Sequence, residues 1–476
     1  MTSQSRNRRG RWAAPMLRIG AIGAMAMLYG CIGPRPDLPA SAAVEPPAAW
    51  RTGTVEATAF DHRWWTTFNE PVLADLVERA MTRNVDLELA VARVEEARAA
   101  ASVALAQTAP QVTIGINGGK ARTVVLGKGV TAWAGQPQVN IAYDLDLFGR
   151  LASANDAARA TLLASAAGRD AVALAVASTT AIAYFALRGL DARLEIARAT
   201  LVARADALRF AQRRADAGYT SRLELQQAQA EYEAARQLVP SAELAVSHAE
   251  NALSVLLGDV PGSIARGKVL EDLDVPRIPA GLPSDLLRRR PDVAAAEAML
   301  VASDSTLDAA RAAMLPNVAL TGSLGVALST AFVNPVSLFS LGGTILSPLL
   351  DGGRLRAQSE VAAARRDQAA FAYRKVALTA FREVEDNLVS LDRLAEEEVA
   401  QRHQVDALRE ALRLASNRYR EGYSPYLDQI DAQRGLLAAQ LVAVQIQSDR
   451  LTTAIALYQA LGGGWSQADP RRCHTC

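Results

Sequence analysis

The chain has 476 residues, with 51 Lys and Arg against 50 Asp and Glu, so its net charge is +1. This balance gives no reason to expect binding to nucleic acid, and 21% charged residues are too many for a polytopic helical membrane protein. Half of the residues are hydrophobic but only 5% are aromatic, a composition that favours long, closely packed helices rich in alanine and aliphatic side chains.

The N-terminus has the layout of an export signal. Several arginines precede a short apolar run over residues 19–28, and the first acidic residue is Asp37. The run is too short to span a bilayer, which needs ~20 residues, and a proline-rich linker over residues 34–47 follows it. We therefore expect residues 1–30 to be a signal peptide.

The apolar run ends in Leu28-Tyr29-Gly30-Cys31. This resembles the lipobox of bacterial lipoproteins, although Tyr29 stands where that motif usually has a small residue. The resemblance implies that Cys31 is the lipid attachment site, and Ile32 after it implies sorting to the outer membrane. Ordinary signal cleavage near the same place is the alternative.

The remainder of the chain is a tandem repeat of about 200 residues. Three pairs of segments match at one offset of 204 residues: Arg214–Gln229 with Arg418–Gln433, Gly149–Leu151 with Gly353–Leu355, and Leu257–Gly258 with Leu461–Gly462. The predicted organisation is an N-terminal linker segment over 31–70, a first repeat over 71–265, a linker over 266–283, a second repeat over 284–465 and a tail over 466–476.

Each repeat contains one very long predicted helix. No proline occurs between Pro137 and Pro240 or between Pro348 and Pro425, so nothing forces a break there. Apolar residues recur along both stretches with the alternating three- and four-residue steps of coiled-coil seams, at Leu187, Leu190, Leu194, Ala197, Leu201 and Leu208 and at Val405, Leu408, Leu412, Ala415 and Tyr419. The sequence predicts helices over 150–217 and 354–421, each roughly 100 Å long.

The long helices are predicted to end at Gly218 and Gly422, residues suited to a left-handed cap. A second helix of some 35 to 40 residues then follows in each repeat.

Two hairpins precede the long helices, at about 111–146 and 316–347. Apolar and polar residues alternate along 111–117, 138–146 and 316–328, and less clearly along 336–346. Strands of this length can cross a hydrocarbon core, although a soluble β-sandwich gives the same alternation. Four strands cannot close a transmembrane barrel, which needs ~8, so we expect several protomers to share one barrel.

The sequence matches carry a resemblance to the outer membrane efflux protein family, the TolC-like outer membrane factors, in the lipoprotein branch that partners RND-type multidrug pumps. They span nearly the whole mature chain, at Trp64–Pro71, Asp144–Arg150, Pro283–Asp292, Ala310–Pro316, Arg418–Gly422, Leu427–Arg434 and Leu461–Trp465.

The resemblance implies a fold that is mainly α with a transmembrane β part, a tandem-repeat long-helix α-barrel and a shared twelve-stranded β-barrel formed by a homotrimer. It implies a passive exit duct for drugs and other small toxic compounds. A periplasmic adaptor and an inner-membrane RND-type pump deliver these compounds to the duct, which has no catalytic chemistry and no cofactor of its own. The expected surroundings are outer-membrane lipid, with no nucleic acid partner.

The same resemblance assigns the periplasmic aperture of the duct. Its residues are Asp428, Asp431, Tyr419, Glu224, Arg418 and Arg420. Two acidic rings near the axis would attract cations and repel each other, so the closed aperture needs interhelical ties, which Tyr419 and Glu224 are expected to supply. The alternative interpretation makes the two aspartates ordinary charges at a helix N-terminus.

The turns between paired helices are the candidate contacts for the adaptor. They contain Gly218, Tyr219, Thr220, Gly422, Tyr423 and Ser424. Plain solvent-exposed turns explain the same residues. An exit duct for a type I-like polypeptide secretion system, or a periplasmic coiled-coil scaffold without a pore, also remains open as a function.

Two further motifs suggest no chemistry. The segment over 262–269 has the glycine and lysine spacing of a phosphate loop, but Val269 replaces the hydroxyl residue that binds the metal ion. Cys473 and Cys476 form a single CxxC without a second pair of ligands, so the sequence predicts no metal site.

Overall fold

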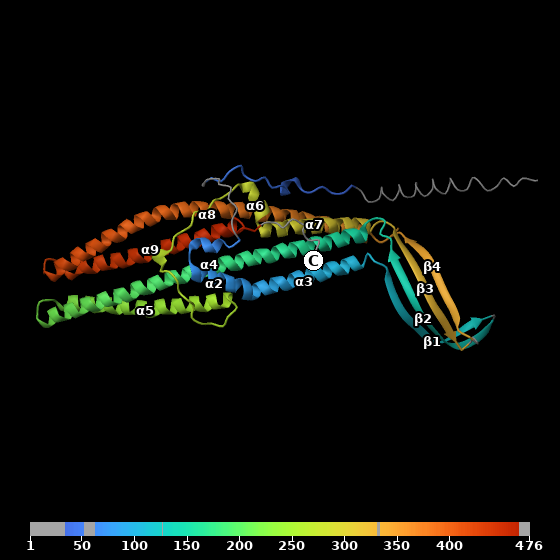
Figure 1. Cartoon of the computed structure of the whole chain (residues 1–476), viewed down its shortest axis with the longest axis horizontal. Coiled ribbons are helices and arrows are strands. Elements are labelled where there is room, and N and C mark those ends of the chain that lie inside the picture. The colour runs from blue at the N-terminus through green and yellow to red at the C-terminus, as the bar shows by residue number, and fades with distance from the viewer. Residues whose placement is uncertain (1–33, 52–61, 126, 331–333, 466–476) are drawn as a thin grey trace, which may run out of the picture. The chain divides into compact units, whose positions relative to one another are not determined.

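The computed structural model describes residues 34–51, 62–125, 127–330 and 334–465 (Figure 1). The expected signal peptide, Cys31 and the tail with Cys473 and Cys476 lie outside these residues. The chain divides into two compact units, the first with residues 1–43, 95–164 and 296–374 and the second with residues 44–94, 165–295 and 375–476. Each unit thus combines segments from both sequence repeats.

The two repeats have the same order of elements. The first contains α2 (Pro71–Arg83), α3 (Val85–Ala106), β1 (Gln111–Val125), β2 (Lys128–Asp144), α4 (Arg150–Asp216) and α5 (Arg222–Leu256). The second contains α6 (Pro283–Arg289), α7 (Pro291–Ala312), β3 (Asn317–Ser329), β4 (Val336–Leu346), α8 (Arg354–Arg420) and α9 (Tyr426–Ala460). Three short 3-10 helices are also described, η1 (Ala40–Ala42), η2 (Trp64–Phe68) and η3 (Leu270–Asp272).

The predicted helices are confirmed. Helices α4 and α8 each have 67 residues, within a residue of the limits expected from the absence of proline and from the seam. Helices α5 and α9 each have 35 residues, within the expected length. Every seam residue of α4 and α8 is buried or half-buried. Among the described helices, α4 is the one with an 18-residue window apolar enough to span a membrane, and 44% of that window is buried inside the chain.

The first unit contains one antiparallel sheet with the strand order β1-β2-β3-β4 (Figure 1). The register aligns four apolar residues across the sheet, Ile114 with Val139, Val139 with Leu324 and Leu324 with Phe339. The next positions along the strands align Thr113, Asn140, Ser323 and Ser340 in the same way. Because side chains alternate along a strand, one face of the sheet is apolar and the other polar.

The apolar side chains that the outer strands β1 and β4 place on the apolar face are exposed in the isolated chain. Ile114 is 82% exposed, Phe339 83% and Leu341 89%. On the opposite face the hydroxyls of Ser323 and Ser340 lie 2.8 Å apart and share a hydrogen bond. Both outer strands, β1 and β4, have one edge unpaired within the described chain.

The prediction that the second strand continues to Asp146 is wrong. Strand β2 ends at Asp144, and Asp146 has a left-handed φ of 45°. Its carboxylate accepts the backbone N–H groups of Leu151 at 3.0 Å and Ala152 at 2.7 Å. The alternation therefore stops where the side chain is needed to cap α4, whose first N–H groups have no partner inside the helix.

The core of the second unit forms where η2 packs on α4 and α9. Trp64 stacks on Tyr458 with ring centroids 5.2 Å apart, and Phe68 packs on Phe185 at the same centroid distance. Trp64 and Trp65 are both buried.

Two glycines with positive φ repeat the same close contact. A Cβ added to Gly258 would lie 2.2 Å from the carbonyl oxygen of Arg83, and one added to Gly462 would lie 2.0 Å from that of Arg289. Gly258 follows α5 and Gly462 follows α9, with φ angles of 72° and 91°. Only glycine fits both the conformation and the contact, so the Leu-Gly pair of each sequence repeat marks a helix end pressed against backbone.

Candidate functional site

The two turns have the same geometry. Gly218 and Gly422 have φ angles of 74° and 80°, as the sequence predicts for left-handed caps. The N–H of Tyr219 donates to the carbonyl of Arg214, and that of Tyr423 donates to the carbonyl of Arg418, both at 2.8 Å. These bonds satisfy carbonyls that the ends of α4 and α8 leave unpaired.

The turns present aromatic side chains to solvent. Tyr219 is 78% exposed and Tyr423 is 77% exposed, and Gly218 and Gly422 are exposed beside them. The hydroxyls of Thr220 and Ser424 are buried and find no hydrogen-bond partner within the described residues. A pair of exposed rings at equivalent positions is a surface suited to a partner protein, because tyrosine combines apolar area with a polar tip.

Tyr419 and Glu224 lie together, as the family resemblance implies. The hydroxyl of Tyr419, on α8, donates a hydrogen bond to Oε1 of Glu224, on α5. Tyr419 is only 2% exposed. Its ring contacts those of Phe210 and Tyr426, with centroids 5.6 and 5.2 Å away.

The guanidinium of Arg214 also packs on the ring of Tyr419, a contact that the sequence did not predict. The guanidinium carbon of Arg214 lies 5.1 Å from the ring centroid, and Nη1 donates to the carbonyl of Tyr419 at 3.3 Å. The repeat contained a signal for this contact, since Arg214 stands at the position equivalent to Arg418. Burial, followed by the bond to Glu224, raises the pKa of Tyr419, so its hydroxyl stays protonated and keeps donating.

The remaining aperture candidates are exposed. Asp428 and Asp431 lie in the first two turns of α9, and neither forms an ion pair within the described chain. Arg418 and Arg420, near the end of α8, are exposed as well and form no ion pair with another described residue. A single chain therefore leaves all four charges available to solvent or to other subunits.

A second tie between helices was not predicted. Arg204 of α4 is 3% exposed, pairs with Glu231 of α5 at 3.2 Å and donates to the side chain of Gln433 on α9. Arg434 of α9 pairs with Glu231 too. Burial lowers the pKa of Arg204, while Glu231 favours its charged form.

The sequence contains a signal for this tie. Arg204 stands seven residues after Ala197, where the spacing of the α4 seam calls for an apolar side chain. A charge on a seam has to be paired when it is buried.

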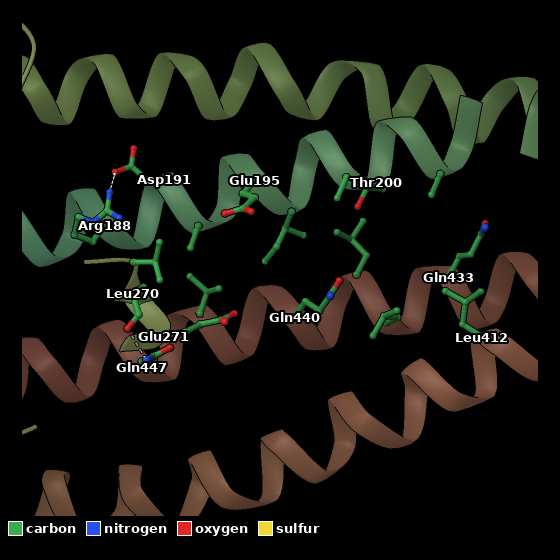
Figure 2. Close-up of a pocket in the computed structure, with 18 of the residues that line it drawn as sticks. Arg188, Asp191, Glu195, Thr200, Leu270, Glu271, Leu412, Gln433, Gln440 and Gln447 are labelled. Carbon is green, nitrogen blue, oxygen red and sulfur yellow. Dashed lines mark hydrogen bonds and ion pairs between the residues drawn. The ribbon is translucent and has the colours of Figure 1, made fainter. Parts of the chain in front are cut away.

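A groove of about 510 Å³ separates α4 from α9 next to this tie (Figure 2). Gln433, Gln440 and Gln447 follow one another along the α9 side at seven-residue intervals. Leu270 of η3 closes one end, where its carbonyl accepts the amide of Gln447 at 2.7 Å. Polar and apolar residues thus both line a region where two long helices stand apart.

The segment with phosphate-loop spacing has a structural role. The N–H of Lys268 donates to buried Glu70 at 2.9 Å, and the N–H of Gly267 donates to the hydroxyl of Tyr184 at 3.1 Å. A Cβ on Gly267 would lie 1.9 Å from Oε1 of Glu70. The glycine and the backbone donors bind the linker to the helices and leave no cradle for a phosphate. No group of side chains suited to a metal ion occurs in the described residues.

Comparison with known proteins identifies relatives over most of the chain. The outer membrane efflux protein family profile matches residues 76–259 and 282–463. The pyoverdine export outer membrane protein OpmQ of Pseudomonas putida is 34% identical over 462 residues, which cover 94% of this chain and 97% of the relative. The toluene efflux pump outer membrane protein TtgC of Pseudomonas putida is 32% identical and covers 88% of each.

Solved structures agree with the described fold. The outer-membrane channel OprN superimposes with a TM-score of 0.81 at 29% identity, covering 91% of this chain and 99% of that one. The open state of the Neisseria gonorrhoeae outer membrane channel MtrE superimposes with a TM-score of 0.80 at 30% identity, covering 90% and 98%.

Proposed function

The chain belongs to the outer membrane efflux protein family, and we propose that three copies form a passive exit duct for drugs and other small toxic compounds. The chain is a mainly α outer-membrane efflux protein with a transmembrane β part and extends into the periplasm. A periplasmic adaptor and an inner-membrane RND-type pump supply the compounds and the energy. The duct itself performs no catalytic step.

The sheet is the observation that supports this proposal most strongly. Its outer strands β1 and β4 have 15 and 11 residues, and each has an edge unpaired within the described chain. An unpaired edge cannot remain in hydrocarbon, because its N–H and C=O groups would have no partner. Pairing β4 of one copy with β1 of the next closes the sheet, and three copies give twelve strands.

The two faces of the sheet define the orientation of this barrel. The row of Ile114, Val139, Leu324 and Phe339 faces lipid, and the row of Thr113, Asn140, Ser323 and Ser340 lines the lumen. The lumen is therefore polar and wet, as in a channel for solutes.

The aperture is proposed at the turns of the helix pairs. Asp428 and Asp431 are exposed and unpaired in one chain, so three copies would place rings of carboxylates at the axis. Tyr419 with Glu224 and Arg434 with Glu231 join helices from different pairs and hold this end closed. The exposed rings of the turns are proposed as the adaptor contacts.

Lipid attachment at Cys31 completes the proposal and anchors the N-terminus in the outer membrane. The names of the relatives favour small-molecule export over polypeptide secretion, since they include a toluene efflux pump protein and a pyoverdine export protein.

Single-channel recording in planar bilayers tests the function. The purified chain should give discrete cation-preferring conductances that rise when the aperture ties are removed. A scaffold without a pore would give no current with either form, and that result would refute the proposal.

A further inference from the structure

The N-terminal segment just after the expected lipid site is bound to the first unit by a buried arginine. Arg366 of α8 is 2% exposed, although residues 34–38, two of which it binds, are themselves exposed. Its Nη1 donates to the carbonyl of Pro36 at 2.6 Å, and its Nη2 donates to the carbonyl of Asp37 at 2.8 Å. A buried guanidinium that donates two hydrogen bonds to backbone carbonyls fixes the path of that backbone.

Two more arginines, Arg35 and Arg311, hold the same segment. Arg35 pairs with Asp304 at 2.6 Å and with Asp308 at 3.1 Å, both on α7. Arg311, in the last turn of α7, donates to the carbonyl of Pro34 at 3.2 Å. Residues 34–37 are therefore held on both α7 and α8.

The composition of this segment suits the contacts. Pro34 and Pro36 have carbonyls but no N–H groups, so the segment offers acceptors without competing for a strand or helix of its own. Guanidinium groups are the matching donors.

The contacts also limit where the anchor can be. Cys31 is three residues from Pro34, a span of at most ~10 Å for a fully extended chain. Pro34 is bound at Arg311, and α7 ends at Ala312, shortly before β3 begins at Asn317.

We propose that Arg366, Arg311 and the pair Asp304 and Asp308 form a tether clamp that holds the lipidated N-terminus beside the start of β3. The acyl chains then enter the periplasmic leaflet of the outer membrane next to the end of the sheet that has to insert there. This inference rests on the proposed function, namely lipidation at Cys31 and insertion of the sheet.

The size of the effect follows from chain statistics. Without the clamp, Cys31 is connected to the first buried residue of the described chain, Trp50, which lies 19 positions further on. A flexible chain of that length spans about 24 Å. With the clamp, Cys31 stays within ~10 Å of Pro34. Effective concentration varies inversely with the accessible volume. Losing the clamp should therefore reduce the effective concentration of the anchor at the sheet about tenfold.

Arg366→Met tests the clamp in full-length protein in isolated outer membranes. The reporter is Leu341→Cys on the apolar face, in a chain with Cys473→Ser and Cys476→Ser, probed with a membrane-impermeant maleimide. Protection of the introduced thiol reports insertion. In the lipidated chain we expect the ratio of protected to labelled protein to fall by at most about tenfold, because the contacts of Arg311 and Arg35 remain. Arg356→Met, which removes an arginine that is 84% exposed on the same helix, should leave the ratio unchanged.

The decisive comparison repeats both variants in a chain exported from a cleavable leader with Cys31→Ser. Arg366→Met should have no effect there, because no anchor is left to position. An equal fall in both backgrounds would show that Arg366 merely supports the helices, and would overturn the proposal. Mass spectra of the N-terminal peptide must show the lipid in the Cys31 chain. An unmodified Cys31 would overturn the clamp while channel currents still upheld the duct.

A second variant avoids the risk of misfolding. Asp304→Asn with Asp308→Asn alters only side chains that are 38% and 44% exposed, and removes both negative charges that pair with Arg35. It should lower protection in the lipidated chain and not in the Cys31→Ser chain. Unchanged protection in the lipidated chain would contradict the part of the clamp that binds Arg35.

Discussion

Tyr419→Phe is the sharpest test of the aperture ties. The change deletes one oxygen and keeps the ring, which packs between Phe210 and Tyr426 and under the guanidinium of Arg214. It therefore removes the bond to Glu224 and little else.

A hydrogen bond to a charged group contributes about 1.5–3 kcal/mol. Because Glu224 is only half-buried, the lower part of that range applies, and the ratio of open to closed apertures should rise roughly tenfold or more for each subunit. Open probability in planar bilayers measures this ratio. Tyr423→Phe is the matched control, because that ring is 77% exposed and its loss of a hydroxyl should change nothing.

The pH dependence has a definite sign. The pKa of Tyr419 is raised by burial, so its protonated form is favoured in the closed state, and the tie is fully present below the ordinary tyrosine pKa of about 10. It is lost only as pH rises beyond that value. The hydroxyl of Tyr419 should therefore cause no change in conductance between about pH 6 and pH 9. Equal open probabilities for wild type and Tyr419→Phe at neutral pH would refute the assignment of this bond to the closed aperture.

Three other changes test separate parts of the account. Asp428→Ala with Asp431→Ala should reduce cation preference and block by multivalent cations; unchanged currents would reject their place at the pore. Ile114→Arg should cost up to about 2–4 kcal/mol of insertion, the value at the bilayer midplane, where Thr113→Arg costs far less, as measured by refolding into lipid vesicles. Equal costs would contradict the orientation of the sheet. Gly462→Ala should lower the melting temperature, because its Cβ would lie 2.0 Å from a carbonyl oxygen and φ is 91°; an unchanged melting temperature would show that the backbone relaxes there.

The sequence predicted the elements well because their signals are local. Proline-free stretches and seam spacing predicted α4 and α8, and the two glycines Gly218 and Gly422 marked their ends. The error at Asp146 arises because a local pattern cannot tell a strand residue from a helix cap. The alternation of apolar and polar residues continues through an aspartate in either case.

The tertiary contacts could not be predicted in the same way. The pairing of Tyr419 with Glu224 was expected from the family resemblance, not from spacing. Arg204 stood out only as a charge on a seam, and its partners on α5 and α9 depend on how three helices approach one another. The contacts of Arg366 left no pattern at all, because backbone carbonyls have no sequence signature.

Native mass spectrometry of the mature protein, released from detergent micelles, tests the central claim most directly. The account predicts particles of three chains, because the sheet of one chain cannot close and its apolar face needs lipid or detergent around it. A monomer that stays in solution without detergent would contradict it.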